Sequence, residues 1–209
     1  MPRRIVKCAD AREWLAKQKR GQHKFIITSL PEMSELGMDS REQYEAWFLE
    51  AAKQVCYVVG PDGYAIFYQT DRRLNGQIVD KAGLLFLAAL HYDMRTVWHK
   101  IAEHRDAGKV DLYRPGYSHL ICFSKNGSAG KAYPDIFPPE RSTWANGMPA
   151  TVTYYACAFA ANKGARYIVD PFCGKGTVLA VANDLKLDAY GIDIDESMCA
   201  EAREFEVKL

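Results

Sequence analysis

Six short apolar runs alternate along the chain with segments that have the periodicity of amphipathic helices. The runs cover residues 24–28, 64–69, 95–101, 119–124, 166–169 and 189–194. Nearly continuous apolar strands are typical of a parallel sheet that helices cover on both faces. The pattern therefore predicts an α/β fold in three layers, with about six mainly parallel strands and helices on both faces.

Helical spacing of apolar side chains supports this prediction between the runs. The expected helices span 9–19, 40–59, 80–93, 149–162 and 177–185, and a last one starts near 195. Ser40 is the expected N-cap of the second helix. Gly60 to Gly63 read as a turn, 104–116 as a polar loop, and 126–147 as an excursion over the surface.

Composition limits the classes of protein that fit. A chain of 209 residues with 48% hydrophobic and 25% charged residues is long enough for one domain. Its net charge of +1 means that a nucleic-acid surface would have to be a local patch. The clearest basic stretch, Lys17 to Lys24, is more typical of a solvated loop.

Cysteine spacing and hydropathy bear on the compartment. Six cysteines stand singly, without the paired spacing of zinc or redox sites, so we expect free thiols, no metal site and a cytoplasmic protein. No apolar run approaches the ~18 residues of a membrane span, so no membrane partner is expected. The start of the chain also has no signal-peptide core.

The segment YIVDPFCGKGTVLAVA points to a ligand site. The fifth apolar run ends at Asp170, glycines follow at 174 and 176, and Thr177 starts a helix whose free N–H groups can bind an anionic group. Asp193 ends the next run, where an acid can bind ribose hydroxyls. A dinucleotide motif would need glycine at Leu179, and a P-loop would need GK[ST], which is absent. A glycine turn with an incidental acid remains the alternative.

DPFCGKGT resembles the cofactor motif DPFxGxGT of the amino-methylating DNA methyltransferases and related RNA enzymes. FIITSLPEM at 25–33 is similar to the catalytic loop of the permuted members, in which that loop precedes the cofactor motif. The resemblance implies a permuted Rossmann-like methyltransferase fold with S-adenosyl-L-methionine (SAM) as cofactor. It divides a single domain, 1–209, into a catalytic-loop half (1–125), the surface excursion (126–147) and a cofactor-binding half (148–209).

The same resemblance implies roles for individual residues. It assigns cofactor binding to Asp170, Pro171, Phe172, Gly174, Gly176, Thr177 and Asp193, and places Thr28, Ser29 and Pro31 against the methyl acceptor. Gln69 and Asp71 follow the second run, where their side chains can accept hydrogen bonds from an amine. A turn with local hydrogen bonds is the alternative there.

The catalytic loop departs from the family pattern. Leu30 replaces the first proline, and Glu32 and Met33 stand where an aromatic residue would stack on a flipped base. Stacking would then fall to other aromatic residues, the candidates being Tyr113, Tyr117 and Trp144.

These features favour a methyltransferase that modifies a nitrogen of a nucleic-acid base, with RNA preferred over DNA because the chain has no separate DNA-recognition domain. A small-molecule or protein methyltransferase and a catalytically silent SAM-binding subunit are the alternatives. The prediction requires the 28–31 and 170–176 turns to meet at one rim of the sheet. The expected strand order is sixth, fifth, first, second, fourth, third, with the last-but-one antiparallel. The edge beside the sixth strand would be open, which favours a homodimer.

Overall fold

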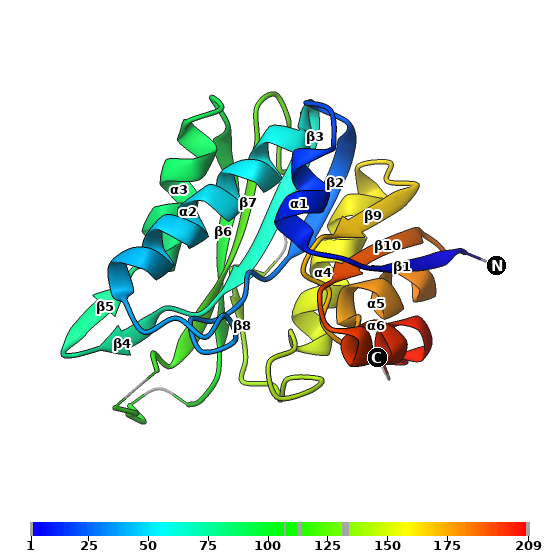
Figure 1. Cartoon of the computed structure of the whole chain (residues 1–209). Helices are drawn as coiled ribbons and strands as arrows, with labels where there is room; N and C mark the ends of the chain where they lie inside the picture. Colours follow the sequence, from blue (N-terminus) through cyan, green and yellow to red (C-terminus); the bar gives the residue numbers. More distant parts are fainter. Residues whose placement is uncertain (1, 107, 113, 131–133, 208–209) are drawn as a thin grey trace.

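An eight-stranded sheet forms the middle layer of the protein (Figure 1). The computed structural model describes residues 2–106, 108–112, 114–130 and 134–207. The strands are β1 (Arg4–Cys8), β2 (His23–Thr28), β3 (Val59–Gln69), β6 (Arg95–Glu103), β7 (Tyr117–Ser124), β8 (Ile136–Phe137), β9 (Tyr167–Asp170) and β10 (Asp188–Asp193). A separate hairpin pairs β4 (Arg72–Leu74) with β5 (Gln77–Val79).

The order of strands in the sheet is β1-β10-β9-β2-β3-β7-β6-β8. Its six central strands are the six predicted ones, in the predicted order. All neighbouring pairs are parallel except β3–β7 and β7–β6, so β7 is the antiparallel strand. The predicted α/β fold is therefore confirmed. The permutation is visible in the sheet, because β9, from late in the chain, pairs with the early strand β2.

The edge expected to be open is filled. β1 pairs in parallel with β10 over Arg4–Cys8, as the blue and orange strands in Figure 1 show. The sequence predicts no element over these residues, because a single apolar pair is flanked there by Arg4 and Lys7. The argument for a homodimer through a bare β10 edge is therefore wrong.

Helices cover both faces of the sheet. On one face lie α1 (Ala11–Ala16), α2 (Arg41–Val58) and α3 (Lys81–Leu90), and on the other α4 (Ala150–Asn162), α5 (Thr177–Asp184) and α6 (Glu196–Glu204) (Figure 1). The bounds agree with the predicted helices to within a few residues. Ser40 caps α2 as expected, because its hydroxyl accepts the Gln43 N–H at 3.3 Å. Across the described part of the chain, no helix combines the length and the apolar character that crossing a bilayer requires.

Alternate residues of the central strands point into two apolar cores, one on each face. Phe67 and Phe123 pack with α2 and α3, whereas Tyr64 and Ile66 pack with α4. The expected turn at 60–63 lies instead within β3, beside an irregularity in its pairing with β2. Since both faces are filled by helices, a ligand can reach the sheet only at its rims.

Candidate functional site

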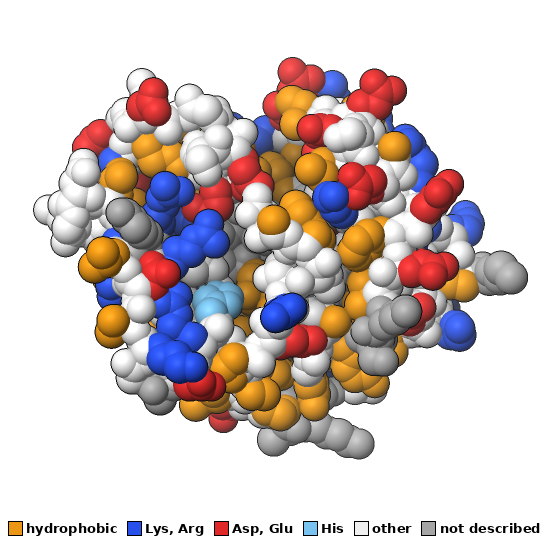
Figure 2. All heavy atoms as spheres, turned by 90° about the horizontal axis from the view of Figure 1, so that it is seen from below, with side chains coloured by type: hydrophobic (Ala, Val, Ile, Leu, Met, Phe, Trp, Pro, Cys, Tyr) orange, Lys and Arg blue, Asp and Glu red, His pale blue; other side chains and the backbone are white. Residues whose placement is uncertain are grey.

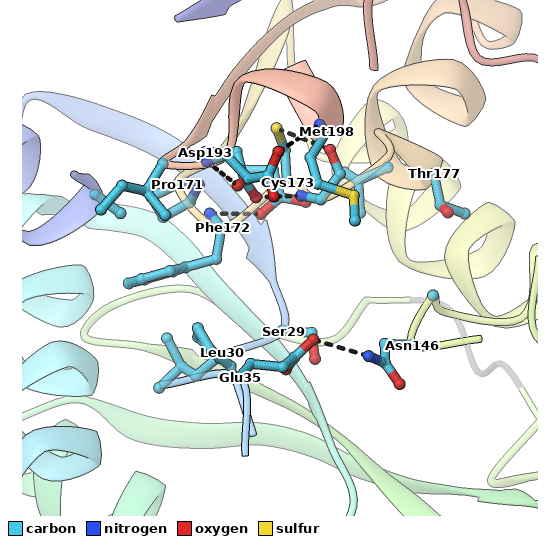
Figure 3. A pocket seen from close by; sticks show the side chains of 18 of the residues that line it. Ser29, Leu30, Glu35, Asn146, Pro171, Phe172, Cys173, Thr177, Asp193 and Met198 are labelled. Atoms are coloured by element: carbon cyan, nitrogen blue, oxygen red, sulfur yellow. Dashed lines mark hydrogen bonds between the residues drawn. The ribbon is translucent and has the colours of Figure 1, made fainter. Parts of the chain in front are cut away.

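A cavity of about 440 Å³ opens at the rim where β2, β9 and β10 end. Its walls come from segments far apart in the chain. Figure 3 shows Ser29, Leu30 and Glu35 on one side and Pro171, Phe172, Cys173 and Asp193 on the other. The geometric requirement of the sequence prediction, that the two turns meet at one rim, is therefore met.

Asp170, the last residue of β9, is 97% buried at this cavity. Its Oδ1 accepts the Thr28 hydroxyl at 2.7 Å and the Phe172 N–H at 3.2 Å. Burial raises the pKa of Asp170 to about 7, although both hydrogen bonds lower it, and the nearby Asp193 carboxylate adds to the rise. A cationic ligand beside a carboxyl in this position strongly stabilises its ionised form.

Two glycines shape the turn between β9 and α5. Gly174 has φ +50° and Gly176 has φ +85°, in the left-handed region that favours glycine. A Cβ on Gly174 would lie 2.6 Å from the Trp144 ring, and one on Gly176 would lie 3.0 Å from Ala202. The Gly174 N–H donates to Asp193 Oδ2 at 2.8 Å. Gly174, Thr177 and Asp193 line the cavity, whereas Gly176 packs behind it against α6.

The Ser29–Pro31 loop is held from behind by buried side chains. Gln69 donates its amide to the Leu30 carbonyl at 3.2 Å, and the Tyr44 hydroxyl donates to the Pro31 carbonyl at 3.0 Å. Ser29, Leu30 and Pro31 line the cavity, but Gln69 and Thr28 do not. Gln69 was predicted to accept a hydrogen bond from the substrate, and it instead positions the loop.

Thr28 also differs from its predicted place beside the methyl acceptor. Its side chain is fully buried, and its hydroxyl donates to Asp170. The reason is the pairing of β2 with β9, which puts the ends of the two strands side by side. Thr28 thus joins the catalytic-loop half to the cofactor-binding half.

The segment before α4 covers part of the cavity. Trp144, Asn146, Gly147 and Met148 line it, and Asn146 donates to Glu35 Oε1 at 2.9 Å across to the loop after Pro31 (Figure 3). Thr143 Oγ1 lies 2.7 Å from Thr177 Oγ1 at the start of α5. Trp144, one of the predicted stacking residues, therefore covers the glycine turn.

The other two predicted stacking residues lie elsewhere. Tyr117 is 40% exposed at the start of β7 and packs edge-on against His119, away from the cavity. Tyr113 lies outside the described residues.

Asp71 holds parts of the fold together, whereas the sequence predicted that its side chain would face the substrate. Its Oδ1 accepts the Lys81 N–H at 2.9 Å at the start of α3, and its Oδ2 lies 3.0 Å from His119 Nε2. Burial alone would raise the pKa of Asp71, but the contacts with His119 and the α3 amides outweigh it and lower the pKa. These bonds are not those of a local turn either, because they tie Asp71 to the start of α3 and to His119 in β7.

Asp71→Ala is expected to destabilise the fold by about 3 kcal/mol, because the buried His119 and the first turn of α3 lose their acceptor. Binding of SAM should stay within about twofold of wild type. Urea unfolding and calorimetric titration measure the two quantities. A variant of wild-type stability that has lost methyl transfer would restore the catalytic assignment.

Two further residues of the cavity are not among those predicted from the sequence. Asp10 follows β1 and caps α1, where its Oδ1 accepts the N–H groups of Arg12 and Glu13. Trp47 was counted only as part of the apolar face of α2, and it packs edge-on against Phe172. Both line the cavity. Recognising residues 4–8 as a strand would have placed Asp10 at the same rim as Asp170 and Asp193.

The charged side chains that line the cavity are mostly acidic. Five carboxyl groups and one guanidinium face or border the cavity: Asp10, Glu35, Asp170, Asp193, Asp195 and Arg12. Such a lining favours a cationic ligand and disfavours phosphate groups. Within the described ranges, no cluster of three or more His, Cys, Asp or Glu side chains has the arrangement of a metal site.

Comparisons with known proteins agree with this geometry. The family model described as DNA methylase (N6_N4_Mtase) matches residues 158–204, which contain the glycine turn and Asp193. No protein of curated function matches the chain.

Solved structures match the fold over almost all of the chain. TTHA0409 of Thermus thermophilus, a putative DNA modification methylase, is 18% identical with a TM-score of 0.73, covering 98% of this chain and 94% of its own. The same protein complexed with SAM has a TM-score of 0.72, 16% identity and coverages of 97% and 93%. The PvuII cytosine-N4-specific DNA methyltransferase has a TM-score of 0.76, 14% identity and coverages of 100% and 89%. The chain therefore has the fold of these methyltransferases, and its segment 158–204, which carries the glycine turn, matches the N6_N4_Mtase family model.

Proposed function

We propose that this protein is a SAM-dependent methyltransferase that modifies an amino nitrogen of a base in DNA. The observation that supports it most is the meeting of Ser29–Pro31 and Asp170–Gly174 in one cavity at the carboxyl rim of the sheet. One wall has the chemistry to hold a cationic cofactor, and the other has the polar loop that an amine requires.

The residues present fit SAM. The sulfonium and ammonium groups of that molecule suit a cavity in which Asp170 is a buried acid with a raised pKa. Asp193 and Asp10, at the ends of neighbouring strands, are placed for the ribose hydroxyls and for polar atoms of the adenine. Phe172 and Trp47, which pack against each other, line the cavity with apolar surface for the ring.

SAM supplies a methyl group already activated by the positive sulfur. The protein then has to orient the acceptor and exclude water. Ser29 lines the cavity, and its hydroxyl oxygen can accept a hydrogen bond from an amine. Gln69 and Tyr44 hold the loop that carries this acceptor without touching the substrate.

DNA replaces RNA as the proposed substrate. The sequence-based preference for RNA used only the lack of a separate recognition domain, and the similar proteins whose substrate is named are DNA methylases. The altered loop at Leu30 and Glu32 keeps the silent SAM-binding subunit as the alternative that the experiment must separate.

Transfer of labelled methyl from SAM to DNA, RNA, protein and small-molecule pools tests the proposal. We expect label in DNA, recovered as N6-methyladenine or N4-methylcytosine after digestion. Ser29→Ala should lower transfer at least about tenfold with SAM affinity unchanged. Ser34→Ala, in an exposed position of the same loop, is the matched control and should change neither quantity. SAM binding without transfer to any pool would indicate the silent subunit, and absence of SAM binding would refute the proposal.

A further inference from the structure

The loop that connects β6 to β7, in the range 104–116, starts at the same rim of the sheet as the cavity. β6 runs parallel to β3, because both are antiparallel to β7, so β6 ends at the rim where β2 and β3 end. Three strand spacings separate β2 from β6, which is about 14 Å. Figure 1 shows this loop beside the β4–β5 hairpin.

Two apolar side chains of this loop are almost fully in solvent. Val110 is 93% exposed and Leu112 is 81% exposed, the two highest values among the exposed large hydrophobic residues of the described chain. Both belong to a polar loop, and neither packs into the two apolar cores. Solvent exposure of two such neighbours is unfavourable for the free protein, which makes them candidates for a contact surface.

Basic side chains surround these two residues. Arg73, in β4, donates from Nη1 to the Asp111 carbonyl at 2.9 Å, and Arg105 Nη1 lies 3.8 Å from the Asp111 carboxylate. Arg114 is tied to the same residue, because its backbone N–H donates to Asp111 Oδ1 at 2.9 Å. Asp111 thus contacts the side chains of Arg73 and Arg105 and the backbone of the exposed Arg114.

The acids nearby neutralise only part of this charge. Lys109 pairs with Asp106 at 2.6 Å, and Asp111 offsets one arginine. Arg72, next to Arg73, lies 4.0 Å from Glu32, but Glu32 is also paired with the buried Lys81. Figure 2 shows Lys and Arg side chains gathered along one side of a hollow on this face, with apolar atoms beside them.

We propose that this surface, formed by Arg73, Arg105, Val110, Leu112 and Arg114, docks duplex DNA beside the cavity. The arginines would contact phosphates, and Val110 and Leu112 would enter the base stack as a wedge. This inference rests on the proposed function for its geometry, because a base inside a duplex must leave the stack before it can reach the Ser29 loop. Apolar wedges flanked by basic residues are suited to unstacking base steps.

Duplex DNA explains both features of the surface together. Phosphates account for the arginines but leave the exposed apolar pair without a use, whereas a single strand needs no wedge, since its bases are already accessible. The other basic stretch, Lys17–Lys24, runs from the end of α1 into the first residues of β2 and so lies at the opposite rim, far from the cavity. It therefore serves as a control surface.

Fluorescence anisotropy with a labelled DNA duplex tests the phosphate contacts. Arg73→Gln/Arg114→Gln should raise Kd at least about fivefold and reduce the slope of log Kd against log salt by about 1–2, the change expected for one or two lost phosphate contacts. Lys19→Gln/Arg20→Gln removes the same charge from exposed residues at the opposite rim and should leave both unchanged. Equal effects of the two pairs would overturn the docking surface.

A duplex with one mismatched pair tests the wedge. Such a duplex resists unstacking less, so wild type should bind it more tightly than the matched duplex. Val110→Ser/Leu112→Ser should lower affinity for the matched duplex at least about fivefold and affinity for the mismatched one much less. Leu87→Ser/Leu90→Ser, on exposed positions of α3, is the control. A wedge variant that binds both duplexes like wild type would refute the wedge.

The two proposals fail in different ways. DNA binding that depends on these residues, without SAM binding or methyl transfer, would support the docking surface and refute the proposed function. Methyl transfer from SAM to DNA, with DNA affinity unchanged in the arginine and wedge variants, would do the reverse. A parallel titration compares duplex RNA with duplex DNA. Tighter binding of duplex RNA that depends on the same residues would overturn the choice of DNA.

Discussion

Asp170→Asn should make the protein more stable at pH 8 and at the same time weaken SAM binding at least about thirtyfold. The loss of affinity follows from removing the buried charge that faces a cationic ligand, a change that typically costs about 2–5 kcal/mol. The gain in stability follows from the pKa of about 7 at this buried acid, against 3.8 for an unperturbed carboxyl. The difference corresponds to an upper bound of about 4 kcal/mol for keeping the charged form folded.

The size of this gain in stability depends on pH. A carboxyl whose pKa is higher in the folded state binds more protons when folded, so it reduces stability as pH rises from about 4 to about 7. The advantage of the asparagine variant should therefore be largest at pH 8 and vanish near pH 4. In wild type, SAM affinity should rise through pH 7, since the ionised form binds the cation.

Thermal unfolding and calorimetric titration between pH 5 and pH 8 measure both effects. Asp184→Asn, at an exposed position of α5, is the control and should leave SAM affinity and its pH dependence as in wild type. A less stable Asp170→Asn variant at pH 8, or one that binds SAM normally, would contradict the assignment of this acid.

Gly176→Ala should cost at least about 3 kcal/mol of stability and abolish SAM binding. The residue has φ +85°, which alone costs a side chain about 1–2 kcal/mol. A Cβ there would also lie 3.0 Å from the Cα and Cβ of Ala202 and 3.1 Å from its carbonyl oxygen. Since these are atoms close to the backbone of α6, the helix itself must move, and the glycine turn moves with it.

Gly164 offers a matched control for this variant. It has nearly the same φ of +81°, but nothing lies within 4 Å of the position its Cβ would take. Gly164→Ala should therefore cost only about 1–2 kcal/mol and leave SAM affinity unchanged. Urea unfolding gives both values. Equal losses in the two variants would show that the contact with α6 does not constrain the turn.

The central sheet could be predicted because its signals are local. Residues 25–27 and 167–169 are apolar throughout, as is typical of strands buried on both faces. The resemblance of DPFCGKGT then placed the late strand β9 beside the early strand β2, which the pairing of Ile26 with Val169 confirms. Asp170, Gly174 and Asp193 meet in one cavity for the same reason.

Tertiary contacts decided the features that the sequence did not predict. β1 has only two apolar residues flanked by basic ones, and its pairing with β10 becomes visible only in the folded chain. Polar residues at strand ends are equally ambiguous. Asp71 and Gln69 looked like substrate-facing groups, but the start of α3 and the Leu30 carbonyl lie within reach and take up their hydrogen bonds.

A crystal structure of the protein with SAM is the sharpest test of where the cofactor and the acceptor lie. We expect the methionine ammonium beside Asp170, the ribose at Asp193 and the methyl group pointing toward Ser29, with Gln69 still donating to Leu30. SAM bound away from the cavity between the 28–31 and 170–176 turns, or with its methyl group pointing away from Ser29, would contradict this arrangement.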